Sequence, residues 1–175
     1  MKNKWFSPKM LLAYAVVLSV IAWRVFVEIP NFTPVMALAF FGGAYLGKKH
    51  MALLLPFSAM IISDLILGLH GTMLYVYLAF AAAVGIGVWL RNRVNVWSVV
   101  GGALASSVIF FLLSNLGVWL TGMVGYPMTI SGLVQSYVAA IPFFRTELIS
   151  TLAFSGVFFG SWYMVKNYTR AFASA

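Results

Sequence analysis

The sequence contains no cysteine, which excludes a disulfide framework and any metal site built on thiolates. Charge is also scarce, because Lys, Arg, Asp and Glu together make up only 8% of the 175 residues. A water-facing surface usually carries about a quarter charged residues, so such a surface cannot cover this chain. Since 63% of the residues are hydrophobic, we predict that residues 1–175 form one transmembrane domain whose outer surface faces lipid.

Metal-binding and catalytic motifs are missing as well. The two histidines, His50 and His70, form no His-x-x-His or Glu-x-x-His pair. The neighbouring serines Ser106 and Ser107 have no histidine near them in the sequence. The basic residues are not interleaved with aromatic residues, as they are in nucleic-acid-binding segments. We therefore expect no enzymatic activity, no metal site, no intrinsic cofactor and no nucleic-acid partner.

The chain does have long apolar runs. We predict that they form helices over about residues 10–27, 33–47, 50–69, 72–90, 96–120 and 141–165. A helix needs roughly 20 residues to cross the hydrocarbon core of a bilayer. The second run has about 15 residues and reaches only about 22 Å, so it can span only if other helices surround it or the bilayer thins locally. These runs predict an all-α membrane protein, a six-transmembrane-helix bundle.

The basic residues fall mostly on one side of this predicted bundle. They precede the first run or follow the second, fourth and sixth: Lys2, Lys4, Lys9, Lys48, Lys49, Arg91, Arg93, Lys166 and Arg170. Arg24 and Arg145 are left for the other side. Because cytoplasmic loops are enriched in Lys and Arg, both termini are predicted to be cytoplasmic. The N-terminal stretch also fits a signal peptide, but no small-residue cleavage site follows its apolar run.

One predicted connection is long. Residues 121–140, TGMVGYPMTISGLVQSYVAA, join the fifth and sixth runs on the outer side and carry no charge. Three glycines and a proline interrupt the segment. We expect this outer loop to fold back over the outer mouth of the bundle as a short interfacial helix.

The stretch GGAYLGKKH, residues 42–50, has the glycine and lysine spacing of a phosphate-binding loop. Such a loop ends with Ser or Thr, which binds magnesium, whereas Lys49 stands at that position here. Apolar runs flank the stretch on both sides. We therefore interpret Gly42, Gly43 and Gly47 as small residues that let helices approach closely in lipid. The lysines mark the cytoplasmic face.

The longer stretch GGAYLGKKHMALLLPFSAMIISDLILG resembles the second-to-third helix signature of S components, the substrate-binding subunits of energy-coupling factor transporters. In that family a GA-x-LG motif ends helix two, and an Asp near the end of helix three corresponds here to Asp64. The segment NFTPVMALAFFGGAYLG also resembles related uncharacterised bacterial membrane proteins. The resemblance implies six helices in a bacterial cytoplasmic (inner) membrane and uptake of a vitamin-like molecule.

The resemblance also implies a partner. In S components, small residues spaced by four on helix one contact a transmembrane coupling subunit, which works with ATPases. Ala15 and Ser19 have this spacing here, and ordinary close packing inside the bundle is the alternative explanation. Solitary cobalamin transporters are the nearest comparison, so cobalamin is one candidate ligand. Their cobalt-binding cysteine has no counterpart in this chain.

Ionisable groups inside a membrane are candidates for function. Asp64 falls in the outer third of the third run. Arg145, near the start of the sixth run, is the predicted partner of Asp64 or of an anionic group on a ligand. Arg24 and Glu28 are four residues apart and are predicted to form an exposed pair. With nearby amides and aromatics, the candidate substrate-binding residues are Asp64, Arg145, Asn115, Trp119, Tyr77, Asn31 and Tyr137. An aromatic belt at the lipid interface is the alternative explanation for the aromatic residues.

We expect the chain to be a membrane uptake protein that binds a vitamin-like small molecule at the outer side and moves it inward. One alternative is a structural or assembly subunit, in which Asp64 and Arg145 face a protein neighbour. Another is an ion-linked carrier centred on Asp64.

Overall fold

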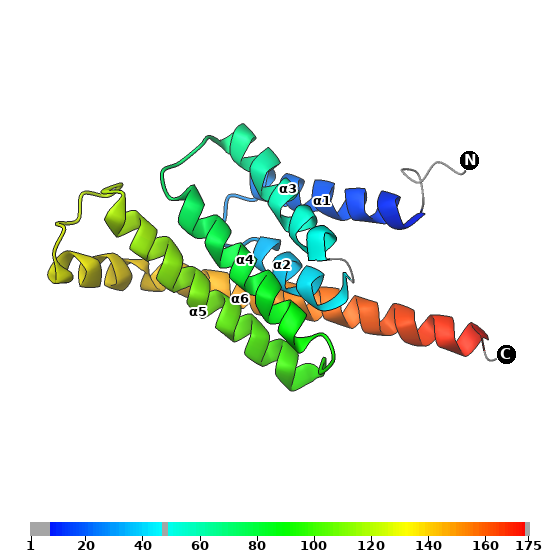
Figure 1. Ribbon diagram of the computed structural model, residues 1–175. Helices are drawn as coiled ribbons and strands as arrows, with labels where there is room; N and C mark the ends of the chain where they lie inside the picture. The colour runs from blue at the N-terminus through cyan, green and yellow to red at the C-terminus, as the bar shows by residue number, and fades with distance from the viewer. Residues whose placement is uncertain (1–7, 47–48, 174–175) are drawn as a thin grey trace.

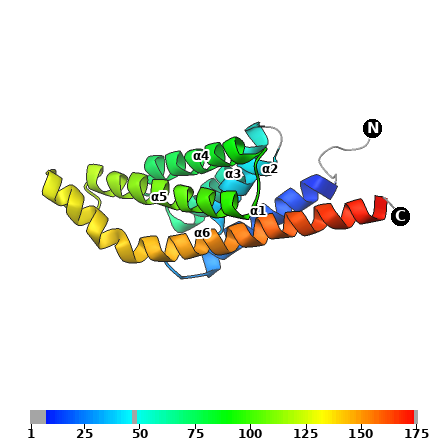
Figure 2. The same ribbon diagram turned by 90° about the horizontal axis from the view of Figure 1, so that it is seen from below.

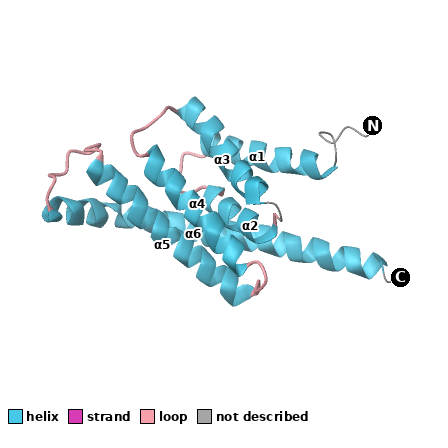
Figure 3. Cartoon of the chain, viewed as in Figure 1, coloured by secondary structure: helices cyan, strands magenta, loops and turns pink. Residues whose placement is uncertain are grey.

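The computed structural model of the chain describes residues 8–46 and 49–173. Within these ranges the structure consists of helices and contains no strand (Figure 3). The helices are α1 (Pro8–Phe26), α2 (Val35–Tyr45), α3 (Lys49–Leu67), α4 (Met73–Leu90), α5 (Val96–Leu120) and α6 (Ile130–Ala173). The start of α1 and the end of α6 lie at the same end of the molecule (Figure 1). The predicted all-α class and the existence of all six helices are confirmed.

Within the described ranges, three helical segments are long and apolar enough to cross a membrane: Met73–Leu90, Val96–Leu120 and Ile130–Asn167. Shorter apolar helices cover Tyr14–Phe26, Val35–Tyr45 and Ala52–Leu67. Large hydrophobic side chains are exposed on the outer surface, including Leu65, Trp97 and Ile130. Scattered exposed apolar residues are normal in soluble proteins, but long apolar helices with exposed apolar faces are typical of membrane proteins.

The short helix α2 lies at the centre of the bundle. It has 11 residues, and nine of them are buried. It contacts α3, α4, α5 and α6 (Figure 1). Of the two conditions predicted for this short run, enclosure by other helices is therefore met.

Glycines allow α2 and α4 to touch through their backbones. A Cβ atom placed on Gly43 would lie 2.1 Å from the carbonyl oxygen of Val84, and one on Gly87 would lie 2.1 Å from that of Phe40. Real Cβ atoms do not approach other atoms so closely, so both positions require glycine. The close-packing interpretation of the GGAYLG stretch is confirmed at Gly43.

A basic residue from the connection between α4 and α5 binds the end of α2. The Nη2 atom of Arg91 donates hydrogen bonds to the carbonyl oxygens of Gly43 and Leu46, at 3.0 and 3.1 Å. The last carbonyls of a helix lack partners within the helix and carry partial negative charge. Arg91 therefore stabilises the end of the central helix, in addition to its predicted role in topology.

The predicted outer loop over 121–140 is wrong in its second half. Helix α6 begins at Ile130, well before the predicted residue 141, so the connection after α5 covers only 121–129. The early part of α6 packs along α5, where Ser136 and Tyr137 donate hydrogen bonds to the carbonyl oxygens of Asn115 and Leu112, both at 3.0 Å. Pro142 lies inside α6, and the helix bends in its yellow part (Figure 2). Proline lacks the N–H group that a straight helix uses at this position.

Candidate ligand cavity

A cavity of about 310 Å³ is lined by residues near the end of α1 and the start of α4, so it lies at the end of the bundle opposite the turn that joins α4 to α5. Its lining comes from α1, α3, α4, α5, α6 and the connections that follow α1 and α3. The apolar part of the wall is rich in phenylalanine: Phe80, Phe110, Phe111, Phe143 and Phe144. A mostly apolar hollow with a few placed polar groups is the usual form of a small-molecule site.

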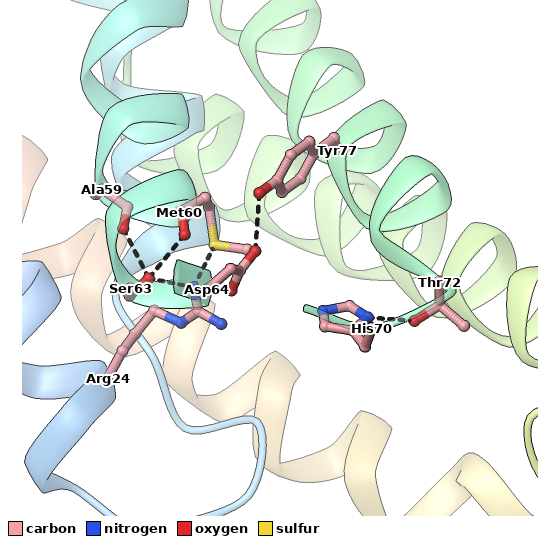
Figure 4. Close-up of polar contacts among 8 residues, drawn as sticks. All are labelled: Arg24, Ala59, Met60, Ser63, Asp64, His70, Thr72 and Tyr77. Atoms are coloured by element: carbon pink, nitrogen blue, oxygen red, sulfur yellow. Dashed lines mark hydrogen bonds and ion pairs between the residues drawn. The ribbon is translucent and has the colours of Figure 1, made fainter. Parts of the chain in front are cut away.

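A charged cluster borders this cavity. The Nη1 atom of Arg24 donates to the Oδ1 atom of Asp64 at 2.9 Å, and it also contacts the Ser63 hydroxyl and the Met60 sulfur (Figure 4). Arg24 lines the cavity, and the second terminal nitrogen of its guanidinium points away from Asp64 (Figure 4). The buried carboxylate is thus neutralised by a residue on the first helix.

This pairing corrects two predictions. Asp64 pairs with Arg24, so the predicted Asp64–Arg145 pair is wrong. The predicted exposed pair of Arg24 with Glu28 is also wrong, because the Arg24 side chain turns into the bundle and is only 17% exposed. Arg145 is exposed on α6 and does not line the cavity. A buried carboxylate needs a compensating charge, and the nearest available one lies 40 residues away in sequence.

The second oxygen of Asp64 is also occupied. The hydroxyl of Tyr77 on α4 donates to its Oδ2 atom at 2.8 Å (Figure 4). Close by, the Nδ1 atom of His70 lies 2.8 Å from the hydroxyl oxygen of Thr72, and both of these residues line the cavity. Asp64 therefore holds α1, α3 and α4 together at the cavity end of the bundle.

Glu147 on α6 is the other buried acid at the cavity. It is 4% exposed, and its Oε1 atom accepts a hydrogen bond of 2.7 Å from Thr151. The Ser107 hydroxyl on α5 interacts with this carboxyl group, but among the described residues no hydrogen bond of normal geometry reaches the buried Oε2 atom. An unpaired carboxylate oxygen in an apolar interior costs free energy, so it marks a place where a partner is expected.

The connection between α1 and α2 forms one wall of the cavity, and hydrogen bonds to α1 and α6 hold it in place. The indole N–H of Trp23 donates to the Phe32 carbonyl at 2.8 Å, and the Ser150 hydroxyl donates to the Thr33 carbonyl at 2.9 Å. Asn31 has a φ of 58°, a left-handed conformation that asparagine tolerates better than most residues. The hydroxyl oxygen of Thr33 is buried without a partner among the described residues, and Thr33 lines the cavity.

The structure brings some of the predicted site residues together. Asn31 and Asn115 line the cavity. Asp64 and Tyr77 form the cluster behind Arg24. The side-chain amide of Asn115 donates to the Phe111 carbonyl on its own helix at 2.8 Å.

Other predicted residues lie elsewhere. The indole N–H of Trp119 donates to the Pro127 carbonyl at 2.9 Å, so it fastens the 121–129 connection. The Tyr137 hydroxyl is bonded to α5, and neither Tyr137 nor Trp119 lines the cavity. The sequence-based set omitted Arg24, Thr33 and Glu147. Glu147 carried a usable signal, because it is an acid inside an apolar run.

The two residues predicted to dock a partner lie on the outside of α1. Ala15 and Ser19 are both exposed, and the Ser19 hydroxyl donates to the Ala15 carbonyl at 2.8 Å. Close packing inside the bundle, the alternative explanation for this pair, is therefore wrong.

Comparison with known proteins gives a family but no activity. The model of a family of unknown function, DUF6580, matches residues 4–172. No curated protein matches the chain, and no solved structure does.

Proposed function

Because the chain belongs to DUF6580, a family of unknown function, we propose a function from its own cavity. The protein is a membrane uptake protein of the S-component type, which binds a vitamin-like small molecule at the outer side and moves it inward. The observation that carries this proposal is the cavity itself, with its phenylalanine wall and two buried oxygens that accept no hydrogen bond within the part of the chain that the structure describes. Small-molecule sites combine these features.

The proposed topology has six crossings with both termini in the cytoplasm of a bacterial cell. Arg91 and Arg93 lie in the turn between α4 and α5, and Lys166 lies in the last part of α6, away from the residues of these helices that line the cavity. Since Lys and Arg are enriched in cytoplasmic loops, the cavity then opens toward the outer leaflet. Helices α1 and α3 have 19 residues each, enough for about 28 Å of a hydrocarbon core of about 30 Å.

The absence of native cysteine makes this topology directly testable. Asn92→Cys lies in the turn after α4, and Val124→Cys lies in the connection after α5; both positions are exposed. In intact cells, a membrane-impermeant maleimide is expected to label Val124→Cys alone. In opened cells it is expected to label both variants. Labelling of Asn92→Cys from outside intact cells would invert the proposed orientation.

The cavity volume bears on the ligand. Small-molecule pockets have volumes of about 300–1,000 Å³, and this cavity of about 310 Å³ is at the lower limit. Cobalamin, with a corrin ring and a nucleotide loop, is far larger than such a space. We therefore propose a vitamin-like ligand with one or two rings.

Direct binding tests the uptake proposal. Purified protein in lipid nanodiscs is titrated with a panel of water-soluble vitamins, cobalamin included, and saturable binding of one small member is expected. Ser114→Phe places a ring in the cavity and is expected to abolish that binding. Ala105→Phe adds the same ring to an exposed position of α5 and is expected to leave binding unchanged. If no vitamin in the panel binds the wild type saturably, the proposal fails.

The small-residue face of α1 supports the proposed partner. Ala15, Ser19 and Ala22 are exposed along one side of α1, so they are accessible to a transmembrane coupling subunit that works with ATPases. The alternative of an assembly subunit predicts that Asp64 faces a neighbouring protein. Asp64 instead binds Arg24 and Tyr77 of this chain, so this alternative has less support. An ion-linked carrier centred on Asp64 has less support, because both carboxylate oxygens are already bonded.

A further inference from the structure

The two unpartnered oxygens at the cavity indicate the chemistry of its ligand, on the premise that the proposed function holds. The Oε2 atom of Glu147 and the hydroxyl oxygen of Thr33 are buried, and among the described residues neither has a hydrogen bond of normal geometry. Both residues line the same cavity. The Thr33 carbonyl is held by Ser150, which lies one helical turn from Glu147 on α6, so the two oxygens belong to one side of the cavity.

The charges around the cavity are not balanced. Arg24 carries one positive charge, and its ion pair with Asp64 offsets it. Ionised Glu147 adds a second negative charge, so one positive charge against two negative charges leaves a net charge of −1 unless a bound cation offsets it. In the empty cavity, burial favours the protonated carboxyl group. Arg145 is exposed and does not line the cavity, and the Nδ1 atom of His70 is engaged by Thr72. A buried carboxylate without a compensating cation is strongly unfavourable.

We propose that the cavity selects ligands that carry a positively charged nitrogen, which Glu147 binds through its Oε2 atom. The Thr33 hydroxyl accepts a second hydrogen bond from the same end of the ligand. The ring of the ligand packs against the phenylalanines, whose faces also attract cations. Glu147 is thus a specificity-determining residue, whereas Asp64 supports the wall of the site.

The test uses two matched pairs of probes. Thiamine and pyridoxamine carry a positive charge, while thiochrome and pyridoxine have related rings without it. Binding to protein in nanodiscs is measured by calorimetry, and the wild type is expected to prefer the charged member of at least one pair. Glu147→Gln keeps the shape but removes the charge, and it is expected to weaken that binding by about 30-fold or more. Glu28→Gln is the matched control, because Glu28 is exposed and does not line the cavity.

A second measurement needs no variant. Dicyclohexylcarbodiimide enters apolar sites, where the carboxyl O–H group adds across one of its C=N bonds to form an acylisourea. Peptide mass spectrometry is expected to find this adduct on Glu147 but not on Asp64, whose oxygens are both bonded. The charged probe that binds is expected to protect Glu147 from the reagent.

The outcomes separate this inference from the proposed function. If a neutral or anionic vitamin binds and Glu147→Gln does not weaken it, the charge preference is wrong while the uptake function stands. Equal binding of the charged and neutral members of each pair, or labelling of Glu147 that no bound probe reduces, also overturns the charge preference. If neither the probes nor the wider vitamin panel binds, both proposals fall.

Discussion

Replacing Gly87 by alanine is expected to separate α2 from α4 and to destabilise the protein by about 3 kcal/mol or more. The added Cβ atom would lie 2.1 Å from the Phe40 carbonyl oxygen and 2.8 Å from the Ala44 backbone nitrogen. Both contacts are backbone atoms, so no side-chain rotation relieves them. Thermal unfolding in detergent, followed by loss of the monodisperse peak in size-exclusion chromatography, measures the effect.

Gly85→Ala is the matched control on the same helix. A Cβ atom at Gly85 would have nothing within 4 Å. Alanine favours helix over glycine by about 1 kcal/mol, so this variant is expected to be as stable as the wild type or slightly more stable. If Gly87→Ala unfolds at the same temperature as Gly85→Ala, the close backbone contact between α2 and α4 is not part of the folded protein.

The second large effect is expected at Asp64. Asp64→Ala leaves the Arg24 guanidinium and the Tyr77 hydroxyl without their acceptor, and it is expected to cost about 3–5 kcal/mol of unfolding free energy. Removing both charges in Arg24→Met with Asp64→Leu is expected to recover most of this loss, because no uncompensated buried charge remains. Equilibrium unfolding of the single and double variants in a denaturing detergent measures the coupling between the two residues.

Arg145→Ala provides the control for this cycle. Arg145 is exposed, and Asp64 is already paired with Arg24, so a change below about 0.5 kcal/mol is expected. A double variant as unstable as Asp64→Ala alone, or a large effect of Arg145→Ala, would contradict the pairing of Asp64 with Arg24.

The helices were predictable because apolar runs and the breaks between them are local features. Predicted and observed bounds agree within two residues for the first five helices. The start of α6 was not predictable in this way. Residues 130–140 include glycine, serine and glutamine, and they are helical because Ser136 and Tyr137 bind the neighbouring α5. A tertiary contact therefore decides that boundary.

The candidate site was predictable only in part, for a similar reason. An acid inside an apolar run stands out in a sequence, which is why Asp64 was selected. Its partner was not evident, because Arg24 has Glu28 at the helical spacing of four, and that local pairing looks sufficient. The distant Asp64 instead binds Arg24 because it is buried and needs a compensating charge. Which oxygens are buried without a hydrogen bond from another described residue, as at Glu147 and Thr33, is known only once the packing is known.

The short central helix α2 also has a consequence for how the protein is made. Its 11 residues extend over about 16 Å, roughly half of the hydrocarbon core, so it is too short to cross a membrane as an independent span. On the proposed topology, α2 becomes stable in the bilayer only when α4 and α6 have been synthesised and enclose it. Completion of the membrane domain is therefore tied to its last helix, and a ribosome-bound chain that ends before α6 is expected to leave α2 open to proteases or chaperones.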